Sequence, residues 1–247
     1  MFRPSERTAE PRRVLLEGDV GVGKTTALKY LAEQWSRQLA PRLVDAFKLV
    51  LYVDLKVARG GGGLLETLLA QCLPPHQQRT VDQLYNVLKQ HQKRVLLILD
   101  GYEYVTAVDD DVWDVLQRAM FRDCSVILSA RSERVTSALT KLFDRRLLVA
   151  GVMTSSREQL ISRYAQMSEA SSEVLTPLLE RLQQEDDSLV QLYSVNPSLC
   201  LFMCLLVQHG QKLDFTSYTG PYTGNCTSHA LQCIHEQSSS KPFSHVL

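Results

Sequence analysis

The first 150 residues of the chain alternate short apolar runs with amphipathic segments. The apolar runs are rich in Val, Leu, Ile or aromatic residues, and such runs between polar stretches predict buried strands. They lie at residues 14–16, 47–55, 94–100, 125–130 and 146–150. Apolar residues at helical spacing predict helices at residues 28–39, 64–73, 80–91 and 112–119, with Pro41 as the stop after the first. Strands that alternate with helices predict an α/β fold, a parallel sheet flanked by helices on both faces.

The pattern changes after Gly151. Residues 155–208 have helical periodicity without a good strand, which predicts a small all-helical subdomain. From Gly210 onward Ser and Thr become frequent and the periodicity disappears, so we expect a poorly ordered tail. The expected organisation is an N-terminal extension (1–10), an α/β domain (11–152), a helical subdomain (153–209) and a tail (210–247).

Composition excludes several classes of function. The 247 residues hold 27 Lys and Arg against 27 Asp and Glu, so net charge gives no reason to expect nucleic acid or an anionic membrane as partner. The polar N-terminus is unlike a signal peptide, and the longest apolar run, Leu199–Val207, is too short to cross a bilayer. The six cysteines include no CxxC pair and are read as small buried side chains rather than a metal site. These features favour a cytoplasmic protein without membrane insertion.

One stretch carries specific chemistry, because it fits G-x-x-x-x-G-K-[ST], the phosphate-binding loop, between a predicted strand and a predicted helix. Glycines let the backbone turn its N–H groups toward one phosphate, and the helix N-terminus adds partial positive charge. Lys24 is expected to bind the outer phosphates, and the Thr25 hydroxyl to ligate Mg²⁺. The predicted nucleotide-binding residues of this loop are Gly18, Asp19, Val20, Gly21, Val22, Gly23, Lys24, Thr25 and Thr26.

Charged residues follow two of the other predicted strands. Asp100 ends the run 94–100, where P-loop folds hold Mg²⁺ with an acid; a helix cap or turn acid is the alternative. Glu103 is a candidate for orienting or deprotonating the attacking water, or else a solvated turn residue. Arg131 follows the run 125–130, where ligands of open α/β sheets bind, so it is a candidate γ-phosphate sensor, or else part of a surface salt bridge.

Two further features have simple structural explanations. Asp109, Asp110 and Asp111 precede a predicted helix and are read as a cap and a favourable first-turn charge rather than a metal site. Pro197 precedes the apolar helix SLCLFMCLL and suits the first helical position.

In this order and spacing the motifs resemble the NACHT domain of the NOD-like receptor (NLR) family, P-loop NTPases of the STAND class, over about residues 11–208. The resemblance rests on RRVLLEGDVGVGKTTALKYLAEQW, RVLLILDGYE, SVILSARSERV and SVNPSLCLFMCLL, and the EGDxGxGKTT wording is especially like invertebrate members. It implies an adenine nucleotide, ATP or ADP, with Mg²⁺ on Asp100. It also implies that Arg131 is the sensor arginine, that Pro197 packs on adenine, and that the domain associates with itself or with other signalling proteins of innate-immune type.

The sequence departs from the family in two respects. Family members usually have the sequence Asp-Gly-x-Asp-Glu at this point, with acids at the third and fourth positions after the first aspartate. Here Glu103 is at the third position after Asp100 and Tyr104 is at the fourth. The loss of one acid weakens the case for hydrolysis more than the case for binding. A winged helix, leucine-rich repeats and a death-fold effector domain are not recognisable, so we expect a fragment, a truncated gene product or a short isoform.

Three functions are therefore weighed. The leading hypothesis is a nucleotide-dependent oligomerisation switch with weak or slow ATP hydrolysis. The alternative is a catalytically active P-loop NTPase or kinase with a small substrate, for which Glu103 is the only candidate base. A nucleotide-insensitive interaction module is disfavoured by the intact Lys24-Thr25 pair.

Overall fold

The computed structural model describes residues 11–58, 63–73, 80–105, 110–168, 172–183 and 193–210. The described part of the chain divides into two compact units, the first within residues 11–20 and 24–149 and the second within residues 21–23 and 150–210. The predicted tail 211–247, the predicted extension 1–10 and Asp109 lie outside the described residues. The domain boundaries stay predictions.

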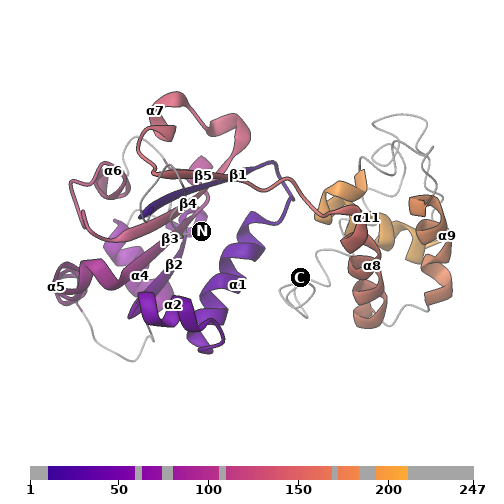
Figure 1. Ribbon diagram of the computed structural model, residues 1–247, viewed down its shortest axis with the longest axis horizontal. Helices are drawn as coiled ribbons and strands as arrows, with labels where there is room; N and C mark the ends of the chain where they lie inside the picture. Colours follow the sequence, from indigo (N-terminus) through magenta and orange to yellow (C-terminus); the bar gives the residue numbers. More distant parts are fainter. Residues whose placement is uncertain are drawn as a thin grey trace. The chain divides into compact units, whose positions relative to one another are not determined.

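The first unit is built on a five-stranded parallel sheet with the order β2-β3-β4-β1-β5. Its strands appear as arrows in Figure 1 and run β1 Arg13–Gly18, β2 Leu49–Asp54, β3 Val95–Asp100, β4 Ser125–Arg131 and β5 Arg145–Leu148. All five coincide with predicted apolar runs, which confirms the α/β fold. Because the strands are parallel, their carboxyl ends meet at one edge of the sheet.

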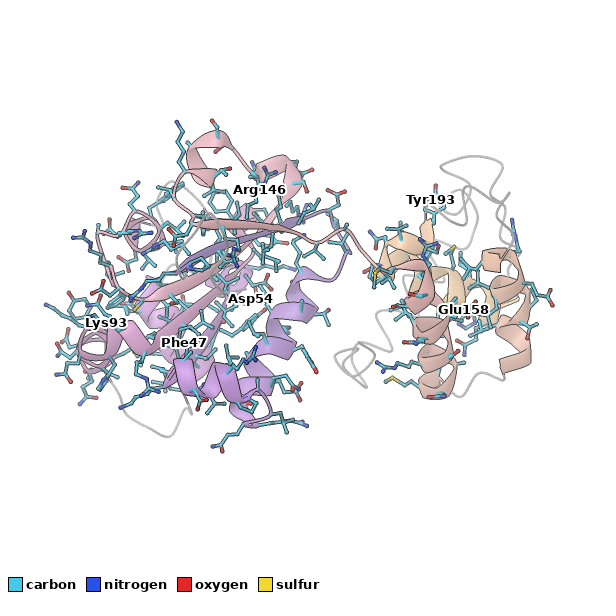
Figure 2. The ribbon with its side chains drawn as sticks, viewed as in Figure 1. Phe47, Asp54, Lys93, Arg146, Glu158 and Tyr193 are labelled. Carbon is cyan, nitrogen blue, oxygen red and sulfur yellow. The ribbon has the colours of Figure 1, made fainter. Side chains whose placement is uncertain are left out.

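Helices cover both faces of this sheet (Figure 1). They are α1 Lys24–Ser36, α2 Pro41–Ala46, α3 Leu55–Ala58, α4 Leu64–Cys72, α5 Val81–His91, α6 Asp110–Leu116 and α7 Ser137–Thr140. Alternate strand residues enter different cores: Leu97 packs with residues of α4, α5, α6 and α7, whereas Ile98 packs with Leu28 of α1. This double burial explains why β1, β3 and β4 read as nearly continuous apolar runs, whereas the edge strand β5 alternates partly buried and exposed residues. Figure 2 shows side chains on both sides of the sheet.

The helix boundaries follow local chemistry. Thr80 caps α5 through a capping box in which its hydroxyl accepts from Gln83 N and the Gln83 side chain accepts from Thr80 N. The prediction for α1 was wrong at its end, because α1 stops at Ser36 and Leu39 is 61% exposed. Gln38 has φ 59°, which breaks the helix, and Pro41 begins α2 at the position that suits proline rather than stopping α1.

The second unit contains the described helices α8 Thr154–Ser168, α9 Ser172–Gln183 and α11 Pro197–Gln208. They share a core that includes Ile161, Leu178 and Met203, which confirms helical character after Gly151. Asn196 caps α11, since its side-chain oxygen accepts from the backbone N–H groups of residues 198 and 199, and Pro197 takes the first helical position as predicted.

Three of the four described cysteines are small buried side chains, as predicted. Cys124, Cys200 and Cys204 are buried free thiols, and Cys72 is partly buried. Burial raises the pKa of Cys124 to about 12. Within the described part of the chain, no helix is both long and apolar enough to span a membrane.

Candidate functional site

The phosphate-binding loop joins the end of β1 to the start of α1. Gly21 and Gly23 have φ of 79° and 100°, in the left-handed region that favours glycine. The ammonium group of Lys24 donates hydrogen bonds to the carbonyl oxygens of Gly18 (2.7 Å) and Asp19 (2.8 Å). The loop therefore curls around its own lysine, and a phosphate would have to compete with two carbonyls for this cation.

The predicted loop residues differ in exposure. Thr25 is exposed and lies in the first turn of α1. Asp19 and Val20 are exposed as well, whereas Gly21, Val22, Gly23, Lys24 and Thr26 are partly buried.

The sheet brings the other predicted residues to the same edge. Gly18 of β1 is the register partner of Arg131 of β4, and Asp100 ends β3, the neighbour of β4. Lys24 lies within electrostatic reach of Glu103 and Asp100. Burial lowers the pKa of Lys24, and these two carboxylates oppose that shift. The predicted phosphate-binding, metal-binding and catalytic side chains thus converge, as expected at the carboxyl end of an α/β sheet.

The carboxylate of Asp100 is buried, with the residue 5% exposed, and both of its oxygens accept hydrogen bonds. The Ser129 hydroxyl donates to Oδ1, and Ser129 Oγ itself accepts from Gly101 N at 2.8 Å. The Tyr52 hydroxyl donates to Oδ2 at 2.8 Å. Burial and the neighbouring Asp100 raise the pKa of Tyr52, so the phenol stays a donor. Asp100 is a held carboxylate at a strand end rather than a helix cap.

Neither Tyr52 nor Ser129 stands out as a site residue in the sequence. Both lie inside predicted strands, and their link to Asp100 depends on β2 and β4 being the neighbours of β3. Ser129 did carry a weak signal, as a hydroxyl two residues before Arg131 in an otherwise apolar strand.

Gly101 shapes the turn that follows Asp100. Its φ is 99° and ψ 58°, and it precedes the 3-10 turn Tyr102–Tyr104. Tyr104 N donates to the Gly101 carbonyl oxygen at 2.9 Å. A Cβ at residue 101 would lie 2.9 Å from Cδ2 of the Tyr104 ring, so the ring occupies the space that only glycine leaves open.

Glu103 and Arg131, the predicted catalytic residues, form an ion pair. Arg131 Nε donates to Glu103 Oε1 at 3.0 Å, with side-chain exposures of 33% and 14% respectively. This hydrogen bond raises the pKa of Arg131. Glu103 Oε2 is buried and has no hydrogen-bond partner among the described residues. Arg131 also forms a longer ion pair with Glu133, in which Nη1 of Arg131 lies 3.8 Å from Oε1 of Glu133.

These residues fit an Mg²⁺-nucleotide. Mg²⁺ keeps several waters and takes one or two protein oxygens beside phosphate oxygens, and the predicted metal ligands Thr25 and Asp100 offer a hydroxyl and a carboxylate. No cluster of three or more His, Cys, Asp or Glu suited to a metal occurs among the described residues, and a site of this kind needs none. The unpartnered Oε2 of Glu103 is an acceptor that a metal-bound or attacking water would satisfy.

Comparisons with known proteins identify the family of the chain. The NACHT domain family matches residues 12–168, more than half of the chain. NLR family CARD domain-containing protein 4 of Xenopus tropicalis is 29% identical over 196 residues, 78% of this chain and 18% of that protein. NACHT, LRR and PYD domains-containing protein 10 of Mus musculus is 30% identical over 168 residues, 66% of this chain and 24% of that protein.

Among solved structures, the Aeropyrum pernix ORC2 protein in ADPNP and ADP complexes aligns with a TM-score of 0.48 and 16% identity, over 81% of this chain and 58% of that chain. The chain spans less than a quarter of the length of the two curated relatives named above. The chain belongs to the NACHT family, and its first unit has the fold of a nucleotide-binding P-loop NTPase.

Proposed function

We propose that this chain is an adenine-nucleotide switch that holds ATP or ADP with Mg²⁺, hydrolyses ATP slowly, and controls self-association in innate-immune-type signalling. The observation that carries the proposal is the ion pair between Glu103 and Arg131. Both side chains lie at the strand ends that ligands of such sheets occupy, yet each is engaged by the other.

The pair supplies the differential contact that a switch needs. A γ-phosphate would compete with Glu103 for Arg131, whereas the β-phosphate of ADP is reached by the loop and Lys24. ATP and ADP would therefore leave Glu103 and Arg131 in different arrangements. A ligand shifts a conformational equilibrium only through such a difference in contacts.

Slow hydrolysis follows from the turn after Asp100. Glu103 is the one acid in the turn Tyr102–Tyr104, and its Oε1 is taken by Arg131. Tyr104 stands where the family usually has a second acid. Its ring packs against Gly101, so this position offers no carboxylate to an attacking water. When bound, Mg²⁺ would neutralise phosphate charge; Thr25 and Asp100 would hold it and Lys24 would hold the outer phosphates.

The adenine preference and the role of Pro197 rest on the family resemblance. Pro197 is buried at the first position of α11. Family relatives that carry CARD or PYD domains in their names suggest signalling by assembly, and this chain would contribute the nucleotide-dependent step.

Calorimetric titration of the full chain with ATP, ADP and GTP in the presence of Mg²⁺ tests the proposal, with phosphate release measured in parallel. We expect micromolar or tighter binding of ATP and ADP, weaker GTP binding and slow release. Size-exclusion chromatography with light scattering should give different oligomeric states with ATP and ADP. Absence of nucleotide binding at micromolar concentration refutes the proposal, and rapid multiple turnover would favour an enzyme.

A further inference from the structure

Tyr52, like Ser129, lies outside the predicted site and donates a hydrogen bond directly to Asp100. It lies in β2, is partly buried, and its hydroxyl donates to Asp100 Oδ2 at 2.8 Å. Its ring packs against the apolar core on the α1 side of the sheet. The ammonium group of Lys29, also on α1, lies 5.8 Å from the ring centroid. Packing thus fixes the ring of Tyr52, and the hydrogen bond to Asp100 fixes its hydroxyl.

Together with Ser129, this contact fixes the plane of the Asp100 carboxylate. Ser129 holds Oδ1 from β4 and Tyr52 holds Oδ2 from β2, so the donors come from the strands on either side of β3. With one donor on each oxygen, rotation of the carboxylate would break at least one hydrogen bond. The remaining lone pairs of both oxygens therefore point in fixed directions, where they can bind a metal ion or its waters.

We infer that Tyr52 is a positioning residue for magnesium, acting through Asp100. The inference rests on the proposed function, in which Asp100 serves Mg²⁺ bound with a nucleotide. Hydrogen-bond partners of metal-ligating carboxylates orient the ligand, and their loss typically lowers metal affinity 10- to 100-fold. Because Ser129 would still hold the other oxygen, the loss expected here is at the lower end, about tenfold.

The test is Tyr52→Phe in the full chain, which keeps the ring, its packing and the neighbouring Lys29 while removing only the hydroxyl. Affinity for a fluorescent ATP analogue is measured with Mg²⁺ and with EDTA, and the ratio of the two affinities reports the contribution of the metal. We expect the variant to lower this ratio about tenfold while the affinity in EDTA stays unchanged. Electron paramagnetic resonance of Mn²⁺ with the nucleotide should show a matching loss of bound metal.

A matched control is Tyr164→Phe in the second unit. The Tyr164 hydroxyl donates to Gln208 Oε1 at 2.7 Å, so this variant also loses one tyrosine hydrogen bond, but to an amide in the helical unit. Its affinity ratio and Mn²⁺ signal should equal those of the wild type. Thermal unfolding of both variants checks that neither loses its fold.

A double-mutant cycle with Asp100→Asn shows whether Tyr52 acts through Asp100. In that background the further change Tyr52→Phe should leave the affinity ratio unaltered. The inference is overturned if Tyr52→Phe keeps the wild-type ratio, as it would when affinity falls equally with Mg²⁺ and with EDTA, or if it lowers the ratio by the same factor in both backgrounds. A wild type that binds no nucleotide would overturn the proposed function and this inference together, an outcome distinct from the other two.

Discussion

Gly101→Ala should destabilise the first unit by about 3 kcal/mol, for two separable reasons. The backbone at Gly101 has φ 99°, and a non-glycine residue held in such a sparsely populated region costs on the order of 1–3 kcal/mol. The new Cβ would also meet Tyr104 Cδ2 at 2.9 Å. The ring is partly exposed and can give way, so this crowding adds only about 1 kcal/mol, the low end for overpacking.

The assay is urea-induced unfolding followed by circular dichroism, with thermal unfolding as a second measurement. A loss of about 3 kcal/mol corresponds to a fall in melting temperature of roughly 6–12 °C for a protein of this size. Because Gly101 N donates to Ser129 Oγ, any shift of this turn is also transmitted to the residue that holds Asp100.

Two controls separate the causes. Gly23→Ala places alanine at φ 100° where a Cβ would meet nothing within 4 Å, so it measures the backbone cost without the ring. In a Tyr104→Ala background, Gly101→Ala should cost about 1 kcal/mol less than in the wild type, since the crowding contribution is gone and the backbone cost stays in place. A Gly101→Ala variant within 0.5 kcal/mol of wild type, or complete recovery on removing the ring, would refute the reasoning.

Three further substitutions test the proposed function. Lys24→Ala should lower ATP affinity about 100-fold, as measured by calorimetry. This is the value of two charge-assisted hydrogen bonds from the lysine to phosphate, reduced by the two that it already makes to backbone carbonyls. As a control, Lys93→Ala, at a lysine just before β3 (Figure 2), should leave ATP affinity unchanged. Glu103→Gln should leave Arg131 freer to bind ATP and reduce phosphate release at least roughly 100-fold; undiminished release would exclude Glu103 as the base. Tyr104→Glu should raise phosphate release if the missing acid is limiting, and an unchanged rate would end that explanation.

The strands and the phosphate-binding loop could be predicted because their signals are local. A strand covered on both faces must be apolar at nearly every position, and the loop needs fixed residue types at fixed spacing. The residues at which helices end were harder to predict from the sequence. Leu39 continues the helical spacing of α1, yet a left-handed residue at Gln38 ends the helix first, and nothing in the apolar pattern records that backbone conformation.

The contacts inside the site could not be predicted, because they depend on which strands are neighbours. Tyr52 precedes Asp100 by 48 positions, and Glu103 precedes Arg131 by 28. Each pair meets only because β3 lies between β2 and β4. Pattern alone identified Asp100, Glu103 and Arg131 as candidates and gave a salt bridge as the alternative for Arg131, but neither the donors on Asp100 nor Glu103 as the partner of Arg131 could be inferred without the order of the sheet.

The two acids of this site are held by different kinds of partner, and the difference bears on how the site responds to ATP. Asp100 is held by neutral hydroxyl groups, which a phosphate does not attract strongly, so its geometry should persist when a nucleotide enters. Glu103 is held by a cation, and in the proposed function an incoming γ-phosphate would compete for that same cation. The proposed metal ligand is therefore preorganised, whereas the Glu103–Arg131 pair is the element expected to rearrange when ATP binds. A switch requires such a bistable contact, and of the contacts described at this edge of the sheet, the Glu103–Arg131 pair has the charge and exposure to provide it.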